Sequence, residues 1–191
     1  MKSQTYERLP EKQRLSKLED RQLVLIATQQ LPYVTTAYEV LANRHSSGLK
    51  AFCRHLCQSN SDAEDALQEA LLRVYHNMHS FRRESSFKTW LYQIAHNECI
   101  NLIRKRKNTT SLDNEINSET TEMLHNEDPS DSEFKRLLSM LDESDRTVVS
   151  LRVMADLEFN EIAAITHSGL SAVKMRYKRA LQKLQDQMEK I

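Results

Sequence analysis

The sequence predicts an all-α protein made of two small helical domains joined by an acidic, flexible linker. Its 191 residues include only two glycines and three prolines, which are too few turn residues for several β-hairpins. Apolar residues recur every three or four positions on both sides of one polar segment, as expected for amphipathic helices. That segment, residues 108–133, is rich in Asp, Glu, Ser, Thr and Asn and contains no Lys or Arg, which is typical of a solvated linker.

These patterns divide the chain into four parts: an N-terminal extension (1–22), a first domain (23–107), the acidic linker (108–132) and a second domain (133–191). The extension is polar and mixed in charge, so we expect it to be disordered or to bind a partner. The alternative to a linker is a loop inside one helical domain. A connection of this length without structure is uncommon within a compact domain.

The composition limits the possible functions. The chain has 27 basic and 27 acidic residues, so its formal net charge is zero, and nucleic-acid binding would have to come from local clusters of charge. No stretch approaches the roughly 18 apolar residues that cross a bilayer, and the first twenty residues lack the apolar core of a signal peptide. Cys53, Cys57 and Cys99 form no disulfide framework. We therefore expect a cytoplasmic protein.

Two amphipathic helices are predicted in the first domain before its most basic segment. The first covers residues 36–57, and Gly48 is expected to interrupt it. The second covers residues 61–78, where Ser61 and Glu64 have the spacing of a capping box. One face of the second helix is apolar. Three polar side chains lie away from the centre of that face: Asp65, Gln68 and Glu69.

The segment "SSFKTWLYQIAHNECINLIRKRK", residues 85–107, combines the only tryptophan with a dense run of positive charge. At helical spacing, one side carries Phe87, Leu91, Ile94, Ala95, Leu102 and Ile103. The other side carries amides, an imidazole and cations, which is the chemistry of a surface that stacks bases and follows phosphates. The alternative, given equal weight from composition alone, is a helix packed by its aromatic residues and solvated by its charges.

Residues 158–184, "EFNEIAAITHSGLSAVKMRYKRALQKL", predict a helix, a tight turn and a second helix. Gly169 in the turn could adopt a positive φ or cap a helix. In the second helix the expected inward positions are Val173, Tyr177, Ala180, Leu181 and Leu184. The expected outward stripe is Ser171, Lys174, Met175, Lys178 and Arg179. A helix of this length, roughly 20 Å, can enter a major groove, so DNA binding is favoured over a structural helical hairpin.

The order of these motifs resembles the extracytoplasmic-function (ECF) class of bacterial RNA polymerase sigma factors. The resemblance covers roughly residues 35–107 and 134–186 and rests on three motifs: "DAEDALQEALLRVY", "FRRESSFKTWLYQIAHNECINLIRKRK" and "LDESDRTVVSLRVMADLEFNEIAAITHSGLSAVKMRYKRAL". It implies a polymerase-binding helix, a segment that opens DNA and reads the minus-ten element, and a domain that reads the minus-thirty-five element. The chain departs from the family at Glu158, where a Ser or Thr usually caps the helix, so we expect that helix to start less firmly.

The resemblance assigns a role to each group of candidate residues. Polymerase binding falls to Asp65, Gln68 and Glu69. Minus-ten DNA binding falls to Arg82, Arg83, Ser85, Ser86, Phe87, Lys88, Asn97, Asn101 and Arg104, with Trp90 packed beneath them. Minus-thirty-five DNA binding falls to Ser171, Lys174, Met175, Lys178 and Arg179. The implied partners are core RNA polymerase, promoter DNA and an anti-sigma factor, often membrane-anchored, which would hold the chain at the inner membrane.

Two other hypotheses compete with this one. A helix-turn-helix regulator that acts without polymerase would need no acidic and amide patch on a separate domain. A metal-responsive or catalytic protein is suggested by Cys53 with Cys57, but cysteines on apolar faces usually belong to the core. No nucleophile and base pattern, phosphate-binding glycine loop or paired carboxylates stand out. We therefore expect neither an enzyme nor a cofactor, metal or small-molecule substrate.

Overall fold

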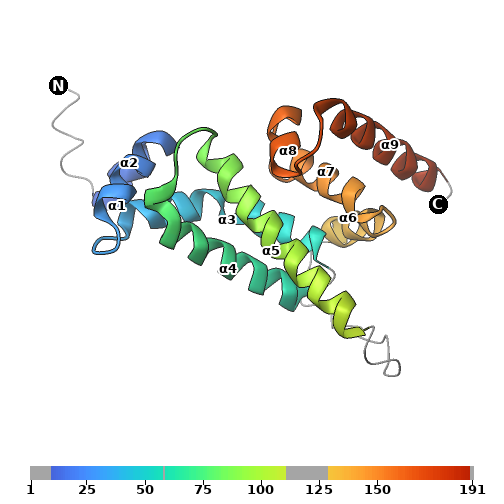
Figure 1. Cartoon of the computed structure of the whole chain (residues 1–191), viewed down its shortest axis with the longest axis horizontal. Helices are drawn as coiled ribbons and strands as arrows, with labels where there is room; N and C mark the ends of the chain where they lie inside the picture. Colours follow the sequence, from blue (N-terminus) through green and yellow to red (C-terminus); the bar gives the residue numbers. More distant parts are fainter. Residues whose placement is uncertain (1–9, 58, 111–128, 190–191) are drawn as a thin grey trace.

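The computed structural model describes residues 10–57, 59–110 and 129–189, and these residues form helices and connecting loops with no strand (Figure 1). The all-α prediction is confirmed. The first helical unit contains α1 (Glu11–Leu15), α2 (Asp20–Gln30), α3 (Thr36–Leu56), α4 (Asn60–Asn77), the 3₁₀ turn η1 (Met78–Ser80) and α5 (Phe87–Thr110). The second contains α6 (Pro129–Ser139), α7 (Glu143–Val153), α8 (Phe159–Ile165) and α9 (Leu170–Met188).

The long helices α3, α4 and α5 pack together, and α1 and α2 cover one end of this bundle (Figure 1). Their apolar faces follow the predicted periodicity. Leu41, Leu49, Phe52 and Leu56 of α3 are fully buried, as are Ala66, Ala70 and Val74 of α4. The small alanines of α4 allow close approach of α3 and α5 on either side. The cap of α4 differs from the prediction, because Ser59 rather than Ser61 accepts the backbone N–H of Asp62 at 3.0 Å.

The N-terminal extension is more ordered than predicted. Residues 1–9 lie outside the described part of the chain, but α1 and the start of α2 fall within the predicted extension, and Leu15 is buried. Arg44 of α3 holds this segment by donating to the carbonyls of Ser16 and Leu18 at 2.9 and 2.8 Å. Its guanidinium also pairs with Asp20 at 2.6 Å. The prediction of disorder is therefore wrong for residues 11–22.

Two helices extend into the predicted linker, residues 108–132: α5 runs to Thr110, and α6 begins at Pro129. The remainder, residues 111–128, lies outside the described part of the chain.

The two helical units pack against each other rather than standing apart. Val148 and Leu151 of α7 and Ile162 and Ile165 of α8 are buried in the same hydrophobic cluster as the core of the first unit. Helix α7 contacts α3, and α8 contacts α5. A second, smaller cluster between α6, α7 and α9 contains Leu138, Val149 and Ala180. The second unit thus has a core of its own and also contributes apolar surface to the interface.

Gly48 lies at this interface, in the middle of a helix that it does not interrupt. A Cβ at this position would lie 2.7 Å from the hydroxyl oxygen of Tyr92 and 3.2 Å from the backbone carbonyl oxygen of Met154. Tyr92 belongs to α5 and is buried, and Met154 ends α7. The glycine is therefore explained by the close approach of both units to α3, not by a break in the helix.

Candidate nucleic-acid interface

An aromatic cluster supports the loop that leads into α5. The rings of Phe81 and Trp90 stack with their centroids 4.8 Å apart, and the ring centroids of Phe87 and Trp90 are 6.1 Å apart. Phe87 is only 4% exposed and also contacts His45. The prediction that Trp90 packs beneath the surface agrees with this arrangement. Phe87 was assigned to the DNA surface, but in this structure its ring belongs to the core, because its neighbours cover it.

The loop itself exposes the polar residues predicted to meet DNA. Arg82, Arg83, Ser85 and Ser86 are exposed, and Lys88 is half-buried. Arg83 has a φ of 60°, in the left-handed region that non-glycine residues rarely adopt. Ser86 caps α5 by accepting the backbone N–H of Thr89 at 3.0 Å. The loop is thus fixed at one end by a helix cap and below by stacked rings.

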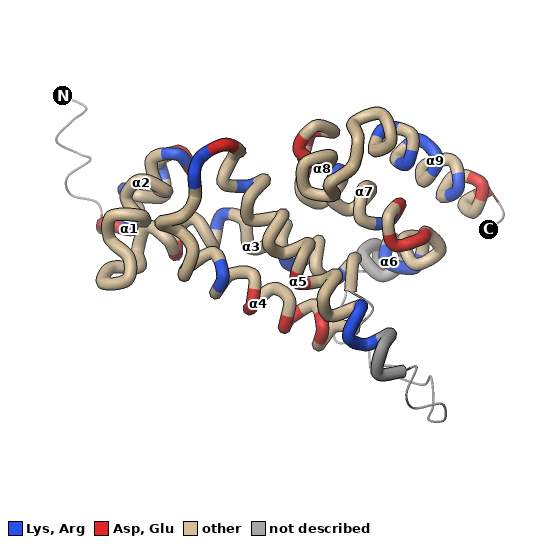
Figure 2. Tube along the Cα trace, in the orientation of Figure 1, with Lys and Arg blue, Asp and Glu red and all other residues tan. Residues whose placement is uncertain are grey.

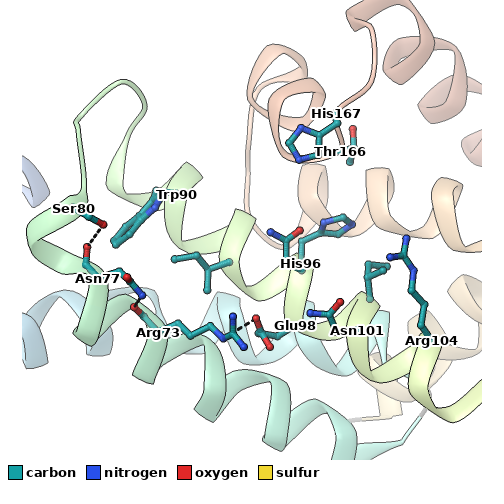
Figure 3. Close-up of a pocket in the computed structure, with 13 residues that line it drawn as sticks. Arg73, Asn77, Ser80, Trp90, His96, Glu98, Asn101, Arg104, Thr166 and His167 are labelled. Atoms are coloured by element: carbon teal, nitrogen blue, oxygen red, sulfur yellow. Dashed lines mark hydrogen bonds and ion pairs between the residues drawn. The ribbon is translucent and has the colours of Figure 1, made fainter.

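A cleft of about 700 Å³ runs along α5, with Trp90, Asn97, Asn101 and Arg104 in its wall. The two amides and Arg104 project from successive turns of α5, as their spacing predicted. Thr166 and His167, in the turn between α8 and α9, form the opposite wall of the cleft (Figure 3). The candidate DNA face of the first unit is therefore partly covered by the second unit.

His96 lies in this cleft and faces the α8–α9 turn (Figure 3). Burial lowers the pKa of His96, and the nearby His167 and Arg104 act in the same direction, whereas hydrogen bonding to Asn97 and the charge of Glu143 oppose the shift. His167 has a φ of 49°. The positive φ of the turn thus belongs to His167, since Gly169 has a φ of −68° and caps α9.

The candidate polymerase surface lies on the exposed side of α4. Asp65, Gln68 and Glu69 are exposed, and with Leu72 they line a shallow hollow of about 640 Å³ that reaches the basic end of α5. Figure 2 shows acidic residues along α4 beside the Lys and Arg residues at the end of α5. The surface therefore offers carboxylates, an amide and one large exposed apolar side chain on a rigid helix.

Arg73 connects this hollow to the cleft on α5. Its Nε lies 3.0 Å from a carboxylate oxygen of Glu69 and 3.0 Å from one of Glu98. Glu98 is 7% exposed, so Arg73 is the counter-ion of a buried carboxylate between α4 and α5. Local sequence patterns do not indicate this pair, because Arg73 and Glu98 lie 25 residues apart.

The helix-turn-helix is formed as predicted. Glu158 and Glu161 form a capping box at α8, in which the Glu161 carboxylate accepts the backbone N–H of Glu158 at 2.9 Å. The helix is therefore firmly capped despite the missing Ser or Thr. On α9, Val173, Ala180 and Leu184 are buried, whereas Leu181 is 43% exposed, contrary to prediction. The exposed residues Ser171, Lys174, Met175 and Lys178 keep their places on the predicted outward stripe.

Arg179 differs from the rest of the stripe. Its guanidinium lies 3.6 Å from the carboxylate of Asp145, which is 1% exposed, and the ammonium of Lys183 lies 3.0 Å from the same carboxylate. Hydrogen bonding to Asp145 raises the pKa of Lys183. Arg179 is therefore a counter-ion for α7 as well as a partly exposed cation. Nothing in the sequence near Arg179 indicates this partner, which is 34 residues upstream.

The three cysteines are buried between α3 and α5 and have free thiols. Hydrogen bonding to the Cys53 and Cys57 thiols and burial raise the pKa of Cys99. Within the described residues, no group of three His, Cys, Asp or Glu side chains is arranged to hold a metal ion. Over the same part of the chain, no helix is long and apolar enough to span a membrane.

Comparison with known proteins identifies both units. A family model of sigma-70 region 2 matches residues 41–109, and a model of sigma-70 region 4 matches residues 137–186. RNA polymerase sigma factor SigV of Bacillus subtilis is 31% identical over 136 residues, covering 70% of this chain and 80% of SigV. The ECF RNA polymerase sigma factor SigW of the same organism is 27% identical over 166 residues, covering 80% of this chain and 89% of SigW.

The solved structure of the sigma factor RpoE in complex with the anti-sigma factor NepR, from Bartonella quintana, superposes with a TM-score of 0.71 at 25% identity. The match covers 82% of this chain and 98% of that chain, so it includes both helical units. The two region models occur in the same order along the chain as the sequence motifs. The matches cover 80% of SigV, 89% of SigW and 98% of the RpoE chain. The chain therefore belongs to the sigma-70 family, in its ECF group, and is an alternative sigma factor that directs transcription initiation.

Proposed function

We propose that the chain is a dissociable subunit of bacterial RNA polymerase that docks through α4 and reads promoter DNA through α5 and α9. The observation that carries this proposal is the presence of two different polar surfaces on two helical units. The acidic and amide surface lies on α4, and the cationic stripe lies on α9. A protein that only bound DNA would not need the first of these surfaces.

We assign polymerase docking to Asp65, Gln68 and Glu69, with Leu72 as an apolar contact. The three polar side chains share one exposed side of a helix that is held by α3 and α5, so docking would require little rearrangement. Leu72 is 53% exposed in their midst. Charged residues around an apolar contact provide steering and specificity, while the apolar group provides buried area.

We assign the minus-ten element to the loop before α5 and to the exposed face of that helix. Arg82 and Arg83 are placed to contact phosphates, and Asn97, Asn101 and Arg104 line the cleft beside Trp90. Amides can hydrogen-bond to the edges of an unpaired base, and a cleft of this size can accept one. Phe87 acts here by supporting the loop rather than by contacting DNA.

We assign the minus-thirty-five element to Ser171, Lys174, Met175 and Lys178. These residues lie along the exposed side of α9, the second helix of the helix-turn-helix, which is the helix that enters the major groove in this class of motif. Arg179 is assigned a mixed role, because its guanidinium already pairs with Asp145. Lys174 and Lys178 have no carboxylate within ion-pair distance among the described residues and are the better candidates for DNA contact.

We further propose that the chain works in the cytoplasm without catalysing a reaction, and that an anti-sigma factor controls it. The complex of the related RpoE with NepR supports this last point. A helix-turn-helix regulator independent of polymerase is the less well supported function, because the region 2 match includes α4 and α5.

The test is the affinity for core RNA polymerase of a variant with Asp65→Lys and Glu69→Lys. We expect a loss of at least tenfold, larger at low salt, because two carboxylates on the docking surface are reversed. Glu64→Lys is the matched control, since Glu64 is exposed on the same helix but does not line the hollow. Equal affinity of the double variant and the control would rule out docking through this surface.

A further inference from the structure

Helix α8 of the second unit is hydrogen-bonded to the start of α5. The Thr89 hydroxyl donates to Oε1 of Glu161 at 2.5 Å, and the Ser86 hydroxyl lies 3.4 Å from the same oxygen. Thr89 is 4% exposed, so its hydroxyl has little access to water in this arrangement. A hydrogen bond to a carboxylate is stronger than one between neutral groups, above all when one partner is buried.

The same side of α5 is covered elsewhere by the second unit. Thr166 and His167 form one wall of the cleft that contains Asn97 and Asn101 (Figure 3). Ile162 and Ile165 of α8 are fully buried in the shared hydrophobic cluster. The contact is therefore an apolar interface with one charge-assisted hydrogen bond at its edge.

This arrangement is incompatible with the simultaneous reading of two promoter elements. The minus-ten and minus-thirty-five elements are about 25 base pairs apart, or about 85 Å at the 3.4 Å rise of B-DNA. In the structure, α5, which is assigned to the minus-ten element, contacts α8 of the helix-turn-helix, which is assigned to the minus-thirty-five element. The two units must separate before both can be engaged.

We propose that Glu161 is a latch, which holds the free sigma factor closed by binding Thr89 and so covers its minus-ten face until polymerase binds. This inference rests on the function proposed above. Both residues of the latch come from this chain, so the closed arrangement needs no anti-sigma factor. The other carboxylate oxygen of Glu161, Oε2, accepts the backbone N–H of Glu158 at 2.9 Å. Glu161 is half-buried, so one carboxylate caps α8 with Oε2 and binds Thr89 with Oε1.

The test uses the full-length chain with Thr89→Val, which removes the hydroxyl and keeps the shape of the side chain. A charge-assisted hydrogen bond of this kind is worth about a tenfold change in an equilibrium constant. We expect a larger radius of gyration by small-angle X-ray scattering and up to tenfold tighter binding to core polymerase, because the competent fraction rises. Thr28→Val is the matched control, since the Thr28 hydroxyl donates within α2, to the Val24 carbonyl at 2.7 Å.

Glu161→Gln is the second variant, in case Thr89→Val disturbs the folding of α5. The amide oxygen can still accept from Glu158, but the charge on the latch is lost. We expect both variants to expand the chain, and the double variant to behave like either single variant, because each one removes the charge-assisted hydrogen bond between Thr89 and Glu161.

An unchanged radius of gyration in both variants would overturn the latch, and so would expansion without any gain in core affinity. If neither the wild type nor the variants bind core polymerase, the proposed function fails. The scattering result then still decides whether Glu161 closes the chain.

Discussion

For the substitution Gly48→Ala, helix propensity predicts a gain in stability, whereas the packing around residue 48 predicts a loss. In the interior of a helix, alanine is normally more stable than glycine by about 1 kcal/mol. At position 48 the new Cβ would lie 2.7 Å from the Tyr92 hydroxyl oxygen and 3.2 Å from the Met154 carbonyl oxygen. Both distances are well inside the usual contact range, and overpacking of this kind costs about 1–3 kcal/mol.

The net effect is expected to be a loss of about 1 kcal/mol in the free energy of unfolding. Tyr92 is 2% exposed, so its ring cannot swing into solvent to relieve the overlap. Tyr92→Phe removes the hydroxyl oxygen, which is the nearer of the two atoms. We therefore expect the double variant with Gly48→Ala and Tyr92→Phe to recover most of the loss, with a favourable coupling energy of about 1–2 kcal/mol between the two sites.

The assay is urea unfolding followed by far-ultraviolet circular dichroism for the wild type, the two single variants and the double variant. Faster amide exchange at the end of α7 in the double variant would report the remaining contact with Met154. Stabilisation by Gly48→Ala with no coupling to Tyr92 would refute the reasoning, because Gly48 would then behave as an ordinary helix position.

Three further predictions follow from charged groups in the structure. Among the described residues, Arg179 and Lys183 are the cations that pair with the buried Asp145 carboxylate. Replacing both by alanine should lower Tm by about 10 °C, more than the sum of the single changes. Burial in the closed arrangement lowers the pKa of His96 from its ordinary value of 6.5. Once the pH falls below that value, the open chain binds more protons than the closed chain, so the closed arrangement loses stability. The radius of gyration should therefore increase between about pH 7.5 and 5.5. Lys178→Ala should reduce the salt dependence of binding to minus-thirty-five DNA by about one unit without changing Tm.

The first two of these predictions have a control within the chain, and the third has an outcome that would contradict it. Lys174 lies on the same side of α9 but pairs with no carboxylate among the described residues, so Lys174→Ala should leave Tm unchanged. If Lys174→Ala lowered Tm as much as the Arg179 and Lys183 double variant, the unpaired charge of Asp145 would not be the cause. His96→Gln should abolish the acid-induced expansion, whereas His79→Gln, at an exposed position in η1, should retain it. A Lys178→Ala variant with the salt dependence of the wild type would mean that this ammonium contacts no phosphate.

The helices could be predicted from local patterns, because their periodicity is set by neighbours in the sequence. The outward stripe of α9 and the apolar face of α4 were predicted in this way. The helical N-terminal segment carries only a short apolar signal, since Leu15 and Leu18, three positions apart, are its residues that pack against the core. The mixed charge of residues 1–22 outweighed this shorter signal.

Contacts between distant residues could not be predicted. The pairing of Arg179 with Asp145 and of Thr89 with Glu161 depends on how helices pack, and neither has a signature in the local sequence. Phe87 shows the same limit: its place at the start of a basic helix suggested exposure, but Phe81, Trp90 and His45 surround it. A glycine at position 48 predicts a break in the helix, because the sequence does not show that Met154 approaches it.

Run-off transcription with purified core RNA polymerase tests the central claim most directly. The template should be a duplex promoter selected for binding by the holoenzyme, with transcripts measured with and without this chain. We predict a transcript of one defined length that requires the chain and is lost when Asp65 and Glu69 are both changed to Lys. Specific binding of the chain to the same promoter without polymerase, together with no transcript when polymerase is added, would contradict the account.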